Sequence, residues 1–193
     1  MIFFTADLHL GHENVIRHCN RPFANASIMD DELIRNWNSR VHRNDTVYVL
    51  GDMFFRVSCA PEMYLERLHG HKHLILGNHD YSWLKRNSAG DIISTPATAF
   101  FESISLMMVI NAHNKVITLC HYPMMTWQGA SHGGLMIFGH IHNNTNAAYW
   151  PLIRASPQML NAGVDVNDFQ PVTLEEMIEN NVLFKERATP DRP

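Results

Sequence analysis

Leu74-Ile75-Leu76-Gly77-Asn78-His79-Asp80 is the stretch around which this sequence is organised. Its apolar half predicts a short buried strand, and Gly77 allows the backbone to turn sharply where the strand ends. The next three residues then offer an amide oxygen, an imidazole and a carboxylate at the carboxyl edge of a sheet, where open α/β sheets place their chemistry. A polar strand-to-helix turn uses the same residue types, so this loop alone does not distinguish structure from function.

The chain ahead of this loop predicts alternating strands and helices. Ser27 and Asp30 resemble a capping box at the start of the longest helix, and Pro61 suits the first turn of the next. The order β-α-β-α-β predicts an α/β fold with parallel strands and right-handed crossovers. The expected strands are 2–6, 46–50 and 73–76, and the expected helices are about 13–19, 27–41 and 61–69.

Beyond Asp80 the pattern predicts a hairpin, two more short strands and a terminal helix. Thr173 and Glu176 form a second capping box in front of that helix. We predict one domain over residues 1–187 and a flexible tail at 188–193. The expected strands are 99–110, 116–120, 135–138 and 159–161, and the expected helices are 81–87 and 174–180.

Composition narrows the class of protein. The net charge is −4, so nothing favours general nucleic-acid binding, and no duplex nucleic acid is expected as a partner. The N-terminus lacks a basic leader and the apolar runs are too short to span a bilayer, so we expect a cytoplasmic protein with no membrane partner. The three cysteines have no paired spacing and are expected to be reduced. The 13 histidines are a reason to look for a metal site.

Side chains of the kinds that bind metals follow five of the predicted strands. In Asp7-x-His9 and His140-x-His142, alternate residues of an extended chain point the same way, so both members of a pair can reach one point. Taken singly, each residue also has a structural explanation, as a turn-capping aspartate or a histidine bonded in the core. Mixed carboxylate, imidazole and carbonyl ligands suit Mn²⁺, Fe or Zn²⁺. The candidate residues are Asp7, His9, Asp52, Asn78, His79, His121, His140 and His142.

These motifs, in this order, resemble the signature of calcineurin-like metallophosphoesterases. The resemblance spans residues 7–142, and the segment 7–23, which contains Arg21-Pro22-Phe23, is similar to a small prokaryotic and phage branch of that superfamily. It implies a four-layer α/β/β/α sandwich with two mixed β-sheets and a dimetal site at the carboxyl edge of the strands. The motifs are Asp7-x-His9, Gly51-Asp52, Gly77-Asn78-His79-Asp80, His121 and Gly139-His140-x-His142.

The resemblance also implies a role for each site residue. Two divalent metal ions are the implied cofactors, with Mn²⁺ favoured and Fe or Zn²⁺ as alternatives. His79 would protonate the leaving oxygen, and Asp80 would orient His79 and keep it protonated. One ion is assigned to Asp7, His9 and His142, the other to Asn78, His121 and His140, and Asp52 is assigned to bridge them.

The hypothesis that follows is hydrolysis of a phosphodiester, such as a small nucleotide or cyclic nucleotide, by in-line attack of a metal-bridging hydroxide. A phosphomonoesterase, including a phosphoprotein phosphatase, is the enzyme alternative. A nuclease ranks third, because the lysines and arginines are few and scattered. An alternative of another class is a non-catalytic, metal-holding scaffold for protein contacts. The sequence leaves the oligomeric state open.

Three residues near the motifs are weaker candidates for substrate binding. Arg56 could fork onto a phosphate, and His12 and Asn14 could line an anion site at the start of a helix. An unpaired surface arginine and helix-capping roles would account for the same residues. The loop 124–134 lies between two ligand-bearing strands, and Trp127 in it could stack on a base, although tryptophans more often cover a core.

Overall fold

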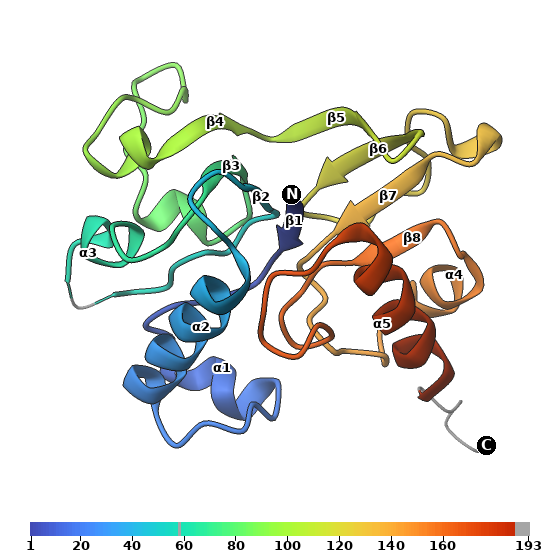
Figure 1. The fold of residues 1–193 in the computed structure, drawn as a ribbon, viewed down its shortest axis with the longest axis horizontal. Coiled ribbons are helices and arrows are strands. Elements are labelled where there is room, and N and C mark those ends of the chain that lie inside the picture. Colours follow the sequence, from blue (N-terminus) through green and yellow to red (C-terminus); the bar gives the residue numbers. More distant parts are fainter. Residues whose placement is uncertain (58, 188–193) are drawn as a thin grey trace.

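The computed structural model describes residues 1–57 and 59–187, so the predicted tail at 188–193 lies outside the described residues. Its strands form two four-stranded sheets with helices packed around them (Figure 1). The strands are β1 (Ile2–Thr5), β2 (Thr46–Val49), β3 (His71–Ile75), β4 (Phe101–Ser105), β5 (Met107–Ala112), β6 (Lys115–Cys120), β7 (Leu135–Phe138) and β8 (Met159–Asn161). The α-helices are α1 (Glu13–His18), α2 (Ala26–Arg40), α3 (Pro61–Leu65), α4 (Trp150–Ala155) and α5 (Leu174–Arg187), and the 3-10 helices are η1 (Asp80–Ser82), η2 (Ala97–Phe100) and η3 (Ala130–His132).

The two sheets differ in strand direction. The first, in the order β1-β2-β3-β4, is entirely parallel. This confirms the parallel arrangement predicted for the first three strands, whereas the mixed character implied for both sheets is wrong for this one. The second sheet, in the order β5-β6-β7-β8, is mixed, because β5 pairs antiparallel with β6 while β6, β7 and β8 run parallel.

One predicted strand, 99–110, is divided between the two sheets. β4 extends the first sheet beside β3, and β5 begins the second beside β6. Leu106 lies at the crossing and is 65% exposed, and Figure 1 shows β4 leading almost directly into β5. The expected hairpin is therefore formed by β5 and β6 alone. Both halves of the segment have an ordinary strand pattern, so local periodicity could not reveal the exchange of partners.

The N-terminus of α2 uses a different cap from the one predicted. The side chain of Asn25 accepts a hydrogen bond from the Ile28 N–H at 2.9 Å, and the helix begins at the next residue. The carboxylate of Asp30, expected in the capping box, instead accepts from the Gly11 N–H at 2.9 Å and the Tyr64 hydroxyl at 2.9 Å. Asp30 therefore anchors α2 to two neighbouring segments rather than capping its own helix.

The predicted capping box of α5 is confirmed. Glu176 Oε2 accepts from the Thr173 N–H at 2.9 Å, and the Glu176 N–H donates to Thr173 Oγ1 at 3.4 Å. The helix itself continues beyond the predicted end at 180. α3 is shorter than predicted, the helix expected at 81–87 is only the short η1, and α4 was not anticipated.

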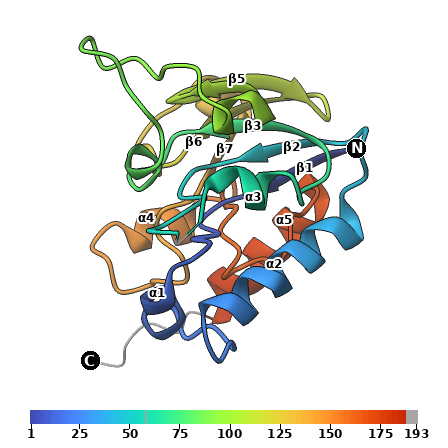
Figure 2. The same cartoon turned by 90° about the vertical axis from the view of Figure 1, so that its left-hand side faces the viewer.

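Three apolar cores alternate with the two sheets. The first includes Trp37 and Phe54 and lies between the first sheet and α1, α2 and α3; Figure 2 shows α1 and α2 together below β1 and β2. The second joins the inner faces of both sheets and includes Phe4 and Ile117, with α5 contributing Met177. The third includes Phe138 and packs the second sheet against α4. This order of cores and sheets fits the four-layer sandwich that the resemblance implies.

Two further findings concern the helices and the cysteines. Within residues 1–57 and 59–187, the helices lack the combination of length and apolar character that crossing a bilayer requires. Cys19, Cys59 and Cys120 are all free thiols, and Cys19 is buried. Cysteines without partners agree with the reduced state predicted for them.

Candidate metal centre

Carboxylates and imidazoles from well-separated segments converge on one point. The ligand-type atoms of Asp7, His9 and His142 lie within 4.8 Å of one another, and so do those of Asp7, Asp52 and His121. Asp52 Oδ2 is 3.5 Å from Nε2 of His9 and 3.5 Å from Nε2 of His121. Asp7 is thus common to both groups, and Asp52 lies equally far from a histidine of each; each group alone has the residue types of a metal site.

Asn78 completes the second group. Its Oδ1 is 3.2 Å from His121 Nε2 and 3.1 Å from His140 Nδ1. The rings of His121 and His140 meet edge to face at 5.1 Å between centroids. All seven predicted ligands are thus brought together, with the loops after β1, β2 and β3 facing those after β6 and β7.

The backbone is strained at this cluster. Non-glycine residues in the left-handed region cost of the order of 1–3 kcal/mol each and persist where the surrounding structure holds them. Such strain gathers at functional sites, so its position here favours a site over a chance group of polar turns. The candidate ligands with positive φ are Asp7 (58°), His9 (52°), Asp52 (55°), His140 (71°) and His142 (51°).

Several polar atoms in the cluster lack a partner. Asp7 Oδ2 and both ring nitrogens of His9 are buried and have no hydrogen bond within the described part of the chain. Folded proteins rarely leave such atoms unpaired, because each costs about 1–3 kcal/mol. Burial, together with the neighbouring His142 and Arg21, lowers the pKa of His9 well below its usual value, which favours the neutral, metal-binding imidazole. The unpaired atoms therefore fit a bound cation.

Two of the histidines have fixed ring orientations. His121 Nδ1 donates to the Leu50 carbonyl oxygen at 2.7 Å, and His142 Nδ1 is 2.8 Å from Asp165 Oδ2. Both contacts leave Nε2 free to face the cluster, as metal-binding histidines require. Although burial opposes it, the hydrogen bond to Asp165 and the charge of Asp7 raise the pKa of His142 to about 11. Asp7 and Asp165 thus stabilise positive charge at His142.

Arg21 and Asp165 form a buried support for these ligands. Arg21 Nε and Nη2 donate to the two carboxylate oxygens of Asp165 at 2.8 and 2.9 Å. The same guanidinium donates to the carbonyl oxygens of Asp7 and Leu8 at 2.7 and 2.8 Å. It therefore ties the ligand loop after β1 to the loop after β8. Sequence reasoning missed Asp165, although it follows a correctly predicted strand.

A second support is a buried amide network centred on Asn161. Its Nδ2 donates to the His142 carbonyl oxygen at 2.8 Å, and its Oδ1 accepts from the Gly163 N–H at 2.8 Å. Its own carbonyl accepts from the side chains of Asn167 and Asn181, both at 3.0 Å. The network links the strained backbone at His142 to α5, and it too went unnoticed in the sequence.

Asp80 does not orient His79 as the resemblance implied. Its Oδ2 accepts from the N–H groups of Asp52 and Gly77, and its Oδ1 accepts from the Met53 N–H and the Trp83 indole. Burial raises the pKa of Asp80, but four donors facing two oxygens require the ionised carboxylate. Asp80 therefore joins the loops after β2 and β3. The expectation that its carboxylate orients the His79 ring is wrong, because its hydrogen bonds go to other groups.

His79 lies at the rim of the cluster. Its Nε2 is 3.9 Å from Asp52 Oδ2, and its backbone N–H donates to Asp52 Oδ1 at 2.8 Å. The ring packs edge to face on Phe55, with centroids 4.8 Å apart. The side chain is 35% exposed, so a ligand entering from solvent could reach it.

The weaker candidates separate in space. His12 packs on Phe55 at 3.9 Å between centroids, next to the cluster, and burial lowers its pKa to about 4. Asn14 instead accepts from Arg17 Nη2 at 2.7 Å on the exposed face of α1. Arg56 lies over the Phe55 ring at 5.2 Å and also lines a cavity between α2 and α3. His12 therefore lies next to the cluster and Arg56 lies on the Phe55 ring that also contacts His79, whereas the Asn14 side chain pairs with Arg17.

Gly51 offers a test of the close packing at the centre. A Cβ at Gly51 would lie 2.5 Å from His121 Nδ1 and 2.6 Å from the Gly77 nitrogen. Gly51→Ala is expected to lower the free energy of unfolding by about 1–3 kcal/mol more than Gly133→Ala, the cost of overpacking. Gly133 is the matched control, because its φ of 80° equals the 83° of Gly51 within a few degrees, while a Cβ there meets nothing within 4 Å. Urea denaturation of both variants measures the difference, and equal losses would contradict the clash.

The fold and the clustered side chains define an α/β protein with a candidate metal centre. The chain is 32% identical over 180 residues to the uncharacterized protein MJ1445 of Methanocaldococcus jannaschii. The alignment covers 92% of this chain and 89% of MJ1445. The chain belongs to the same family as MJ1445. The Gene 66 protein of Mycobacterium phage L5 is 27% identical over 161 residues, covering 73% of this chain and 77% of the phage protein. No family model matches the chain.

The fold is also found in a solved structure. The protein of unknown function AQ665 from Aquifex aeolicus aligns with a TM-score of 0.67 and 25% identity, over 93% of this chain and 98% of that one. A predicted phosphoesterase from Streptococcus pneumoniae aligns with a TM-score of only 0.36 and 13% identity, over 73% of this chain and 62% of that one. That second likeness is too remote to assign a fold or an activity.

Proposed function

We propose that this protein is a calcineurin-like metallophosphoesterase that hydrolyses a phosphodiester with two divalent metal ions. The observation that carries the proposal is the convergence of seven ligand-type side chains, from the ends of five strands, around buried atoms that have no hydrogen-bond partner among the described residues. A structural cluster of turns would satisfy those atoms internally. Seven ligands exceed the need of one ion, and two ions held side by side would use them all.

The two ligand sets proposed here are those that the resemblance implies, and the observed groups are compatible with them. Asp7, His9 and His142 would hold one ion, and Asp52, with Oδ2 3.5 Å from both His9 and His121, is suited to lie between two ions. Asn78, His121 and His140 would hold the other. When bound, such ions supply an activated water and neutralise the charge of a phosphoryl group. Mixed oxygen and nitrogen ligands accept Mn²⁺, Fe or Zn²⁺, and we favour Mn²⁺.

The protein's own groups would contribute binding and proton transfer. His79 lies at the exposed rim, within 3.9 Å of Asp52, where it could donate a proton to the departing oxygen of an ester. The edge-to-face contact with Phe55 and the backbone hydrogen bond to Asp52 limit the movement of this residue. The proposed substrate is a small nucleotide or cyclic nucleotide. A phosphomonoesterase is the second enzyme candidate, and a non-catalytic scaffold is the candidate of another class.

Hydrolysis of bis-p-nitrophenyl phosphate by metal-stripped protein, titrated with Mn²⁺, tests the proposal. Activity is expected to appear with the metal and to exceed activity on p-nitrophenyl phosphate. Asp52→Asn is expected to reduce it by about 100-fold, since it removes the central carboxylate charge. Asp31→Asn, on an exposed side chain that pairs with Arg67, is the control and should retain full activity.

Three outcomes would change the proposal. Preference for the monoester would favour the phosphomonoesterase. Turnover that is independent of metal would contradict the dimetal assignment. Two bound ions per chain, measured by calorimetry, without turnover of either ester would favour the scaffold.

A further inference from the structure

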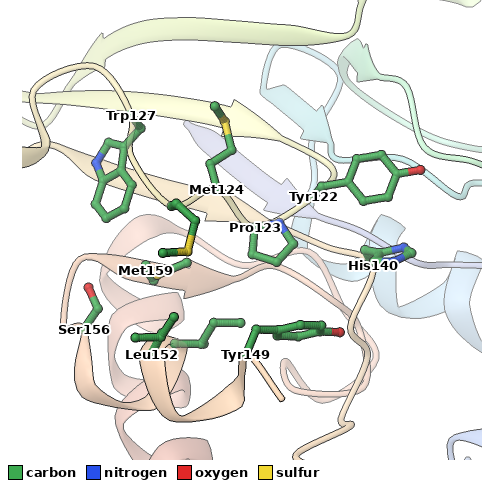
Figure 3. A pocket seen from close by; sticks show the side chains of 11 residues that line it. Tyr122, Pro123, Met124, Trp127, His140, Tyr149, Leu152, Ser156 and Met159 are labelled. Atoms are coloured by element: carbon green, nitrogen blue, oxygen red, sulfur yellow. The ribbon is translucent and has the colours of Figure 1, made fainter. Parts of the chain in front are cut away.

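A cavity of about 510 Å³ opens beside the candidate metal centre, on the side of the second sheet and α4. Figure 3 shows His140 at one end, between Tyr122 and Tyr149, with Trp127 and Ser156 at the opposite end. The volume lies in the range of sites that enclose small organic ligands, about 300–1,000 Å³. Nothing in the chemistry proposed above uses this space.

The cavity and the ligand cluster share a boundary. His140, a candidate ligand, lines the cavity. The Tyr122 hydroxyl, from the same lining, is 3.5 Å from Asn78 Oδ1, and the Tyr122 ring meets the His140 ring edge to face at 4.6 Å. A group attached to a phosphoryl centre at the cluster would therefore enter the cavity directly.

The lining selects for an uncharged occupant. Among the residues that the structure describes, the lining contains no lysine, arginine, aspartate or glutamate, and His140 is its only ionisable group besides the two tyrosine hydroxyls. The rest consists largely of aromatic rings and of aliphatic and methionine side chains. A charged substituent would lose its hydration there without a partner. Methionine sulfur and tyrosine or tryptophan rings make favourable contacts with aromatic ligands.

The far wall is held in place by hydrogen bonds. Trp127 Nε1 donates to the Gly134 carbonyl oxygen at 2.9 Å, and Gln158 Nε2 donates to the same oxygen at 2.8 Å and to that of Ala130 at 2.9 Å. The loop that carries the cavity wall is therefore fixed to the start of β8. A preformed cavity favours a rigid ring over a flexible alkyl chain, because the chain loses more conformational freedom on binding.

We propose that this cavity binds a planar aromatic substituent of the phosphoester substrate, such as a nucleobase or an aryl ring. The inference rests on the proposed function, since the cluster is what anchors the phosphoryl group. It adds the place where the ring of such a substrate would lie, and it implies that esters carrying a ring are bound better than esters of small aliphatic alcohols.

Calorimetric binding of phosphonates to the Mn²⁺-loaded protein tests this inference without requiring turnover. Phenylphosphonate and its longer homologue benzylphosphonate are compared with methylphosphonate, and n-hexylphosphonate supplies an alkyl chain with as many carbons as phenyl. At least one of the two aromatic probes is expected to bind about tenfold or more tightly than the methyl and hexyl probes. Leu152→Glu, which adds a charge to the cavity lining, is expected to abolish that preference.

Leu183→Glu is the matched control, because Leu183 is 47% exposed on α5, against 53% for Leu152 on α4, and does not line the cavity. It should keep the preference for the ring. Equal affinity for methyl and aromatic probes, or a ring preference that survives Leu152→Glu, would overturn the inference and leave the proposed function standing. Preference for hexyl would assign the cavity to an alkyl chain instead. Failure of every phosphonate to bind would overturn both proposals.

Discussion

Replacing Asp80 with asparagine is expected to lower the free energy of unfolding by about 2–6 kcal/mol, because two buried donors would lose their acceptor at about 1–3 kcal/mol each. Asp80 accepts from three backbone N–H groups and the Trp83 indole. Asparagine would turn its NH₂ group toward two of these donors, which cannot bond to it. The loops that carry Asp52 and Asn78 would lose their common anchor, so Mn²⁺ affinity should fall as well. Urea denaturation of metal-stripped protein measures the stability.

The same substitution in a His79→Ala background separates two roles for Asp80. If Asp80 joins the two loops, Asp80→Asn costs the same stability in both backgrounds, because its four bonds do not involve His79. If Asp80 served to orient His79, the second substitution would add little once His79 is gone. A stability loss below about 1 kcal/mol in either background would contradict the anchoring role, since that is the range of surface changes.

Arg21→Lys is expected to cost about 3–5 kcal/mol of unfolding free energy, although the charge is retained. The guanidinium binds both oxygens of Asp165 and two backbone carbonyls at 2.7–2.9 Å, and both side chains are almost fully buried. An ammonium group is a point charge and cannot bond to all four acceptors at once from that position. Asp165 would then hold His142 less firmly, so metal affinity should also decrease.

Arg67→Lys is the control for this experiment. Arg67 pairs with Asp31 at 2.7 Å, but the two side chains are 49% and 65% exposed. Exposed pairs contribute about 0–1 kcal/mol, so this variant should unfold at nearly the wild-type urea concentration. Equal effects of Arg21→Lys and Arg67→Lys would show that the buried pair has no special structural importance.

The ligand cluster could be predicted because a simple rule governs it. Parallel strands end at a common edge, so polar residues after consecutive strands meet there. Asp7, Asp52 and Asn78 follow β1, β2 and β3, and their convergence required no knowledge of packing. His121 and His140 follow β6 and β7 of the second sheet. Their approach to the first sheet depends on how the sheets face each other, which the resemblance supplied and the strand pattern did not.

The supporting residues could not be predicted in the same way. Arg21 and Asp165 are 144 residues apart, and no local spacing relates them. Asn161 on β8 and Asn181 on α5 are 20 residues apart, and neither their spacing nor their residue type indicates that they bond to each other. Asp80 was recognised as a site residue but given the wrong contact, because a resemblance transfers residue types more safely than hydrogen bonds. The missing information in each case is the tertiary arrangement.

The origin of the candidate ligands in two different sheets has a consequence for the whole molecule. Asp7, His9, Asp52 and Asn78 come from the first sheet, whereas His121, His140 and His142 come from the second. A cation shared between them would act as a non-covalent cross-link between the halves of the fold, complementing the single covalent crossing at Leu106. A ligand that binds only the native state raises the free energy of unfolding. The metal affinity would therefore set how much the free energy of unfolding rises when the metal is added.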